Sequence, residues 1–98
     1  MNDTIYHGKD IPNFINKIIV IRWISSTCNY IGKVMEGEKL MIKHIIIVED
    51  GKPKVELMRG AIYAPVDSDR AQVRFPNEKE YKLYKKIVRK KLIYNKWT

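Results

Sequence analysis

The chain has 98 residues, of which 45% are hydrophobic and 31% charged, and its formal net charge is +8 at pH 7. A chain of this length buries only about 60 to 65% of its unfolded surface, so we expect a single domain over residues 1–98 rather than two cores. Its charges are mixed in sign and its hydrophobic content is ordinary, which argues against wholesale disorder, while the net charge favours anionic partners.

Cysteine content and hydropathy bear on location. Cys28 is the only cysteine, which excludes an intrachain disulfide and a cysteine-built zinc site and favours an intracellular setting. The first ten residues lack a basic stretch followed by an apolar one, so they do not predict a secretory signal. The longest apolar runs fall far short of the roughly 18 residues that a membrane-spanning helix needs. We therefore expect a soluble intracellular protein with no membrane role.

The first half of the chain predicts a short helix followed by strands. Asp10 is a candidate N-cap for the segment that follows it, with Pro12 tolerated in the first helical turn. Runs rich in β-branched residues then predict strands over 18–24, 29–35 and 40–48. The third of these should be central, because its last residues are almost continuously apolar, as in a strand covered on both faces.

The second half predicts shorter strands. Glu49, Asp50 and Gly51 form a strong hairpin signal, and Gly60 should bend or bulge the chain between two strands. The strands predicted here cover residues 54–58 and 61–64 and, after a loop over 65–69, a short edge strand at 71–75.

Residues 77–97 predict an amphipathic helix. Asn77 is placed as the N-cap, Glu80 completes a capping-box pattern, and Pro76 lies just outside. At 100° per residue, one half of the helix is apolar, with Tyr81, Leu83, Tyr84, Ile87, Val88, Leu92 and Tyr94. The other half is basic, and we name it the basic face: Lys79, Lys82, Lys85, Lys86, Arg89, Lys90 and Lys96.

These elements predict an α+β fold, with a small antiparallel sheet of four or five strands and the C-terminal amphipathic basic helix packed on it. The basicity is largely local, because residues 78–98 carry eight Lys and Arg against two Glu. Two interpretations stay open for the basic face. It is either a surface that binds phosphates with release of counterions, or a solvated face whose lysines keep the domain soluble.

We expect a non-enzymatic protein that binds DNA or RNA with low specificity through the basic face. The alternative is a protein-interaction module with no nucleic-acid role. It would form a homodimer or bind a host factor. The contact would be made through an exposed edge strand or through the apolar half of the helix. The tyrosines Tyr81, Tyr84 and Tyr94 should pack in the core, although tyrosines beside lysines can also stack on unpaired bases.

Catalytic signals are weak. Asp67 and Asp69 would need Glu49, Asp50 or Glu56 nearby to hold a divalent ion for nuclease chemistry. Cys28 has no identifiable base, and the sequence has no phosphate-binding, dinucleotide-binding or zinc-protease motif. We therefore expect no catalytic residue, metal, cofactor or small-molecule substrate. His44 should be a packed histidine, and Arg22 should pair with a carboxylate or emerge at an edge.

Residues 14–62 resemble the Sm-like RNA-binding barrel. The resemblance consists of a short leading helix, the run IIVIRW, the segments YIGKV and LM, and MRGAI near the position of the family's second motif. Ile42 and Ala61 stand where the family usually has RNA-contacting asparagines, and the long basic helix is at the opposite end of the chain. The family's uridine-binding residues therefore do not carry over, and we do not predict the barrel.

The composition is similar to that of small uncharacterised proteins of the filamentous and rod-shaped viruses of hyperthermophilic archaea. The shared features are rich Ile, Lys and Tyr usage with one Gln and one Cys in a short chain. The low Gln and Cys content is typical of proteins from hot habitats. The resemblance implies a location in the host cytoplasm and an interaction with viral DNA or with host defence. It assigns no functional residue.

Overall fold

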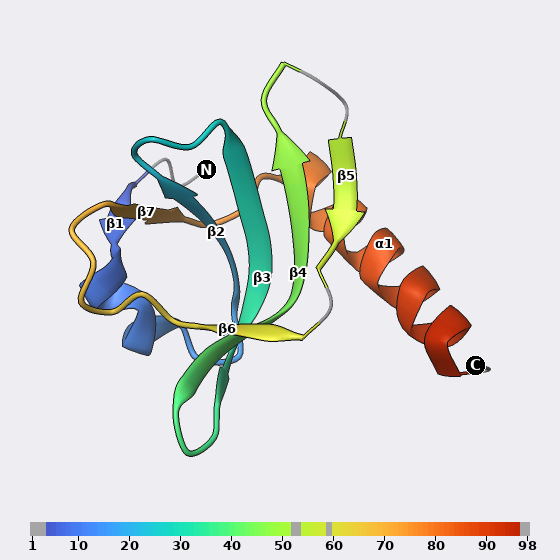
Figure 1. Cartoon of the computed structure of the whole chain (residues 1–98), viewed down its shortest axis with the longest axis horizontal. Helices are drawn as coiled ribbons and strands as arrows, with labels where there is room; N and C mark the ends of the chain where they lie inside the picture. Colours follow the sequence, from blue (N-terminus) through green and yellow to red (C-terminus); the bar gives the residue numbers. More distant parts are fainter. Residues whose placement is uncertain (1–3, 52–53, 59, 97–98) are drawn as a thin grey trace.

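A computed structural model describes residues 4–51, 54–58 and 60–96, with side chains described as far as residue 90. Figure 1 shows the elements, which in chain order are β1 (Tyr6–His7), the 3₁₀ helix η1 (Gly8–Phe14), β2 (Ile18–Trp23), β3 (Cys28–Glu36), β4 (Leu40–Glu49), β5 (Lys54–Leu57), β6 (Ala61–Tyr63), β7 (Ala71–Arg74) and α1 (Glu78–Lys96).

The strands form one antiparallel sheet in the order β1-β7-β2-β3-β4-β5, and β6 also pairs with β4. The predicted α+β class is confirmed, but the predicted sheet of four or five strands is wrong, because the sheet has seven. β5 and β6 pair with different parts of β4, opposite 46–49 and 41–43 respectively, so each counts as a strand. β1 has only two residues, too few to show an alternating pattern.

The unpredicted strand β1 also changes the position of β7. Val73 of β7 pairs with Tyr6 on one side and with Ile21 of β2 on the other. β7 is therefore an inner strand, and the prediction of an edge strand at 71–75 is wrong. Figure 1 shows β7 beside β1 and β2, far along the sheet from β5.

A bulge bends the pair β3 and β4. The register shifts between Ile31 and Lys33, so that Gly32 faces two residues of β4, His44 and Ile45. A Cβ on Gly32 would lie 2.5 Å from Cγ2 of Ile42, which requires glycine there. His44 adopts the left-handed conformation with φ 55°. His44, which we predicted to be packed, is half-buried and lies at the bulge.

Side chains from the two faces of the sheet enter different cores. Ile19 and Ile21 of β2 join the core that contains Ile11 and Phe14 of η1. Val20, between them, joins the second core. That core also contains Ile31, Ile46, Tyr84 and Val88, the last two from α1. The sheet is thus covered by η1 on one face and by α1 on the other. The strand predicted to be central, β4, is an inner strand that lies between β3 and the end strands β5 and β6.

The short helix η1 begins earlier than predicted. Its N-cap is His7, and Asp10 lies inside the helix rather than at its N-cap. The Asp10 carboxylate accepts a hydrogen bond of 3.0 Å from the His7 N–H. Gly8, the first residue of η1, is buried against the loop before β7, where a Cβ would overlap the Pro65 carbonyl oxygen.

Candidate functional site

The N-terminus of α1 has the predicted capping box. The Glu80 N–H donates to the Asn77 side-chain oxygen at 2.8 Å, and the Asn77 N–H donates to Glu80 Oε1 at 2.9 Å. These two bonds satisfy backbone donors that the first turn of a helix otherwise leaves unpaired. The capping box therefore fixes the residue at which α1 begins.

Arg74 at the end of β7 ties the sheet to the start of α1. Its guanidinium donates to both oxygens of the Glu80 carboxylate, at 2.7 and 2.8 Å. The hydrogen bond to Glu80 raises the pKa of Arg74 against the opposing effect of burial. Burial alone would raise the pKa of Glu80, but Arg74 and the bond from Asn77 outweigh it and hold that pKa below its usual value. The sequence pattern identified the cap but not the role of Arg74.

Replacing Glu80 with glutamine should lower the free energy of unfolding at pH 7 by about 1–2 kcal/mol, since the charged bidentate pair is lost. Because the folded-state pKa of Glu80 is depressed, its stabilising contribution is present above the unfolded pKa and is lost as the pH falls through the folded one. Urea unfolding at pH 7 and at about pH 3 measures the effect. The difference between wild type and Glu80→Gln should shrink at the lower pH, and an unchanged difference would contradict this role.

The apolar half of α1 lies against β4 and β5. Tyr84 and Val88 are buried, and Leu83 and Ile87 are partly buried beside them in the second core. Burial raises the pKa of Tyr84 to about 12, so its hydroxyl stays neutral. Tyr81 is 42% exposed, and its predicted place in the core is therefore wrong. The side chain of Tyr94 lies outside the described residues.

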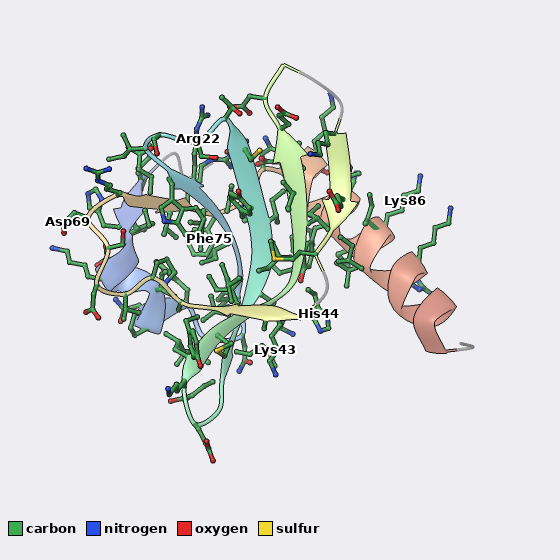
Figure 2. The ribbon with its side chains drawn as sticks, in the orientation of Figure 1. Arg22, Lys43, His44, Asp69, Phe75 and Lys86 are labelled. Atoms are coloured by element: carbon green, nitrogen blue, oxygen red, sulfur yellow. The ribbon has the colours of Figure 1, made fainter. Side chains whose placement is uncertain are left out.

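The basic face points away from the sheet. All six of its members with described side chains are exposed: Lys79, Lys82, Lys85, Lys86, Arg89 and Lys90. Figure 2 shows Lys86 extending from α1 into solvent. The seventh member, Lys96, has no described side chain. At a rise of about 1.5 Å per residue, the six positions cover about 17 Å of helix.

Few of these basic side chains form an ion pair or a cation–π contact within the protein. Lys82 forms an exposed ion pair of 3.2 Å with Glu78, one helical turn earlier. The Lys85 ammonium lies 5.2 Å from the ring centre of Tyr81. Among the residues with described side chains, Lys79, Lys86, Arg89 and Lys90 have no carboxylate partner. Four exposed cations of the basic face therefore remain available to a ligand, and three of them, Lys86, Arg89 and Lys90, are neighbours on the helix surface.

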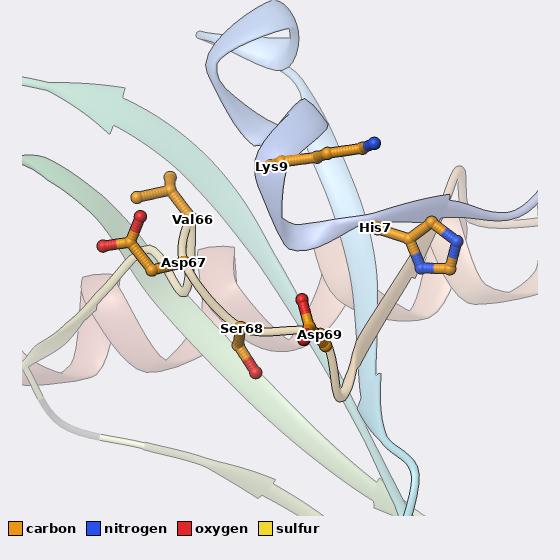
Figure 3. Close-up of a pocket in the computed structure, with 6 residues that line it drawn as sticks. All are labelled: His7, Lys9, Val66, Asp67, Ser68 and Asp69. Atoms are coloured by element: carbon orange, nitrogen blue, oxygen red, sulfur yellow. The ribbon is translucent and has the colours of Figure 1, made fainter.

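The acidic residues considered for a metal site are not brought together. Asp67 and Asp69 line a pocket of about 390 Å³ with His7, Lys9 and two neighbouring loop residues. Figure 3 shows Asp67 directed away from the side on which His7 and Asp69 lie. Asp50 lines a different cleft. Within the described residues, no group of three or more His, Cys, Asp or Glu side chains has a metal-binding arrangement.

Arg22 pairs with a carboxylate, which is one of the two alternatives that the sequence predicted; the other was a position at the edge of the sheet. Its guanidinium lies 2.5 Å from Asp50, whose other oxygen accepts a hydrogen bond of 3.0 Å from the Asn29 amide. Arg22 and Asp50 line a cleft of about 320 Å³ together with Gln72 and Arg74. The arginines are paired to Asp50 and Glu80, so this cleft has less free positive charge than the basic face.

A groove that the sequence did not reveal lies at the hairpin of β3 and β4. Its volume is about 510 Å³, and its lining includes Met41, Lys43 and Tyr63. Tyr63 is 64% exposed, and the Lys39 ammonium lies 5.1 Å from its ring centre. Glu36 and Glu38 also line the groove, so its charge is mixed.

Comparison with known proteins adds no further assignment: no protein-family model, no curated protein and no solved structure matches the chain. Neither helix in the described part of the chain combines the length and the apolar character that crossing a membrane requires.

Proposed function

We propose that this protein binds nucleic acid with little sequence preference, without enzymatic activity, through the basic face of α1. The observation that carries the proposal is that six basic side chains are exposed on the side of α1 turned away from the sheet, while its opposite side is fixed in the second core. The face thus lies on a helix that packs against the sheet, and not on a loop.

The physical basis is phosphate neutralisation. Each lysine or arginine that contacts a phosphate releases condensed counterions, and this release supplies most of the free energy of non-specific binding. Lys86, Arg89 and Lys90 are neighbours on the helix surface at spacings of three and four residues. A phosphate backbone that crosses α1 can contact several members of this cluster at once.

Low specificity follows from the composition of the face. Of its seven members, only Arg89 has a planar guanidinium suited to bidentate recognition of guanine. A lysine ammonium acts as a point charge on a flexible stem and favours phosphate contacts, which position a protein but do not read sequence. We therefore expect affinity to depend on charge density far more than on base order.

Competition binding tests this proposal. The protein should bind a fluorescently labelled duplex of mixed sequence at about 50 mM salt. Unlabelled duplexes of shuffled sequence should compete within about threefold of one another, because each base-specific contact would add about 1–3 kcal/mol of discrimination. Lack of binding at this salt concentration would contradict the proposed function. A competition range of a hundredfold or more would contradict its low specificity.

A further inference from the structure

The sheet ends at β5, which has a neighbour on one side only. β5 pairs with β4 over Lys54–Leu57, and the order of the described strands stops there. An unpaired strand edge presents free N–H and C=O groups that can hydrogen-bond to another strand. The side chains at this edge determine which strand fits.

The backbone groups that face outward can be assigned from one hydrogen bond. The Met58 N–H donates to the Ile45 carbonyl oxygen at 2.8 Å, so the backbone groups of residue 58 point toward β4. Since this direction alternates along an antiparallel strand, the groups of Glu56 also face β4 and those of Val55 and Leu57 face away. Val55 is therefore able to form a reciprocal pair of hydrogen bonds with an added strand.

We propose that β5 pairs with β5 of a second copy of this chain, antiparallel and centred on Val55. In this register Val55 lies opposite Val55 of the second copy. Lys54 lies opposite Glu56 of the second copy, and Glu56 opposite its Lys54. Opposite charges directly across an antiparallel pair are stabilising. Lys54, Val55 and Glu56 are all exposed in the single chain, with Val55 at 39%.

The shifted register centred on Glu56 is less favourable, because it places the two Glu56 carboxylates opposite each other. The residue before Lys54 is a proline, which has no N–H and cannot donate in a longer ladder. The pairing is therefore short, and the dimer should be weak, in the class of interfaces that bury less than about 1,200 Å².

The proposed pairing has a consequence for α1. Paired residues of an antiparallel ladder lie on the same face of the sheet, so the two-fold axis is perpendicular to the sheet and both helices lie on one side. Figure 1 shows α1 running behind β4 and β5 and beyond the β5 edge, toward the position of the second copy. Both basic faces would then belong to one surface. The shared basic surface matters only if the proposed function holds, whereas the dimer itself does not rest on that function.

Charge reversal at the edge tests the dimer in the absence of nucleic acid. Sedimentation velocity of the full chain from about 10 µM to about 1 mM should show a monomer–dimer equilibrium. Lys54→Glu alone and Glu56→Lys alone each place like charges opposite each other in a homodimer, and each should weaken dimerisation by at least about tenfold. An equimolar mixture of the two variants should restore it as a heterodimer.

The double variant Lys54→Glu with Glu56→Lys provides the matched control, because it exchanges the charges and keeps their complementarity. It should dimerise about as well as wild type. A monomer at all concentrations, or dimers whose strength is the same in all variants, would overturn the proposed interface. Thermal unfolding of each variant checks that the exposed substitutions leave the fold intact. Nucleic-acid binding by a chain that stays monomeric would refute the dimer and leave the proposed function standing.

Discussion

Replacing Gly8 with alanine should lower the free energy of unfolding by about 3 kcal/mol or more, the largest loss expected for a single methyl group in this protein. The added Cβ would overlap the Pro65 carbonyl oxygen and lie 3.1 Å from that of Ser68. Both obstacles are backbone atoms, which cannot turn away as a side chain can. Either η1 or the loop before β7 would have to move, and the core that contains Ile11 and Phe14 would open.

Chemical denaturation of Gly8→Ala measures this loss, and Gly37→Ala is its matched control. Gly37 is exposed at the hairpin of β3 and β4, where the nearest atom to an added Cβ is 4.0 Å away. The control should change the free energy of unfolding by no more than about 0.5 kcal/mol. Equal stability of the two variants would show that η1 does not approach the 65–68 loop as described.

Reversing three charges of the basic face should reduce duplex affinity at about 100 mM salt by at least about 100-fold. The variant Lys86→Glu, Arg89→Glu, Lys90→Glu removes three neighbouring cations and adds three charges that repel phosphate. At this salt concentration each lost phosphate contact costs close to a factor of ten through counterion release. The side chains are exposed, so the fold and the second core should be unaffected.

Fluorescence anisotropy measures that affinity, and a second triple variant separates a local effect from a general one. Lys9→Glu, Lys17→Glu, Lys39→Glu makes the same change in net charge at exposed positions outside α1. It should weaken binding by less than about tenfold, through the long-range field alone. Equal losses in the two triple variants would assign binding to the overall charge and not to the basic face.

Elements with strong local signals were predictable from the sequence. The α1 start at Glu78 was correct because Asn77 and Glu80 have side chains that bond the backbone within one turn, independently of the rest of the fold. The hairpin after β4 was also predictable from local sequence, because Asp50 followed by Gly51 is a turn signal. In the structure Gly51 adopts a φ of 74°, as such a turn requires. The density of β-branched residues predicted β2, β3 and β4 to within one residue at each end.

Features that depend on distant residues were not predictable. β1 is a strand only because β7 passes beside it, about 65 residues further along the chain, and no pattern in two residues reveals this. The same pairing made β7 an inner strand. Tyr81 fits the apolar half by angle, yet it lies at the border of the helix face that the sheet covers and is exposed.

The candidate site likewise has features that the local sequence predicts and features that depend on contacts between distant residues. The helical period alone placed the six described members of the basic face on the exposed side of α1, because apolar and basic residues are segregated at 100° per residue. The Arg74 contact with Glu80 and the groove beside Tyr63 depend on how separate strands meet. The interpretation of Asp67 and Asp69 as part of an acidic cluster required Glu49, Asp50 or Glu56 nearby. Asp50 instead pairs with Arg22, and within the described residues no three such side chains have a metal-binding arrangement.

The salt dependence of duplex binding by the unmodified protein tests the central proposal most directly. Affinity measured by anisotropy from about 50 to 300 mM salt should fall with a log–log slope of about −3 to −5, since each phosphate contact contributes about −0.9. That slope would show several phosphate contacts, and its loss in the variant Lys86→Glu, Arg89→Glu, Lys90→Glu would place them on the basic face of α1. A slope near zero, or no binding at the lowest salt concentration, would contradict the proposal and identify its lysines as a solvated surface.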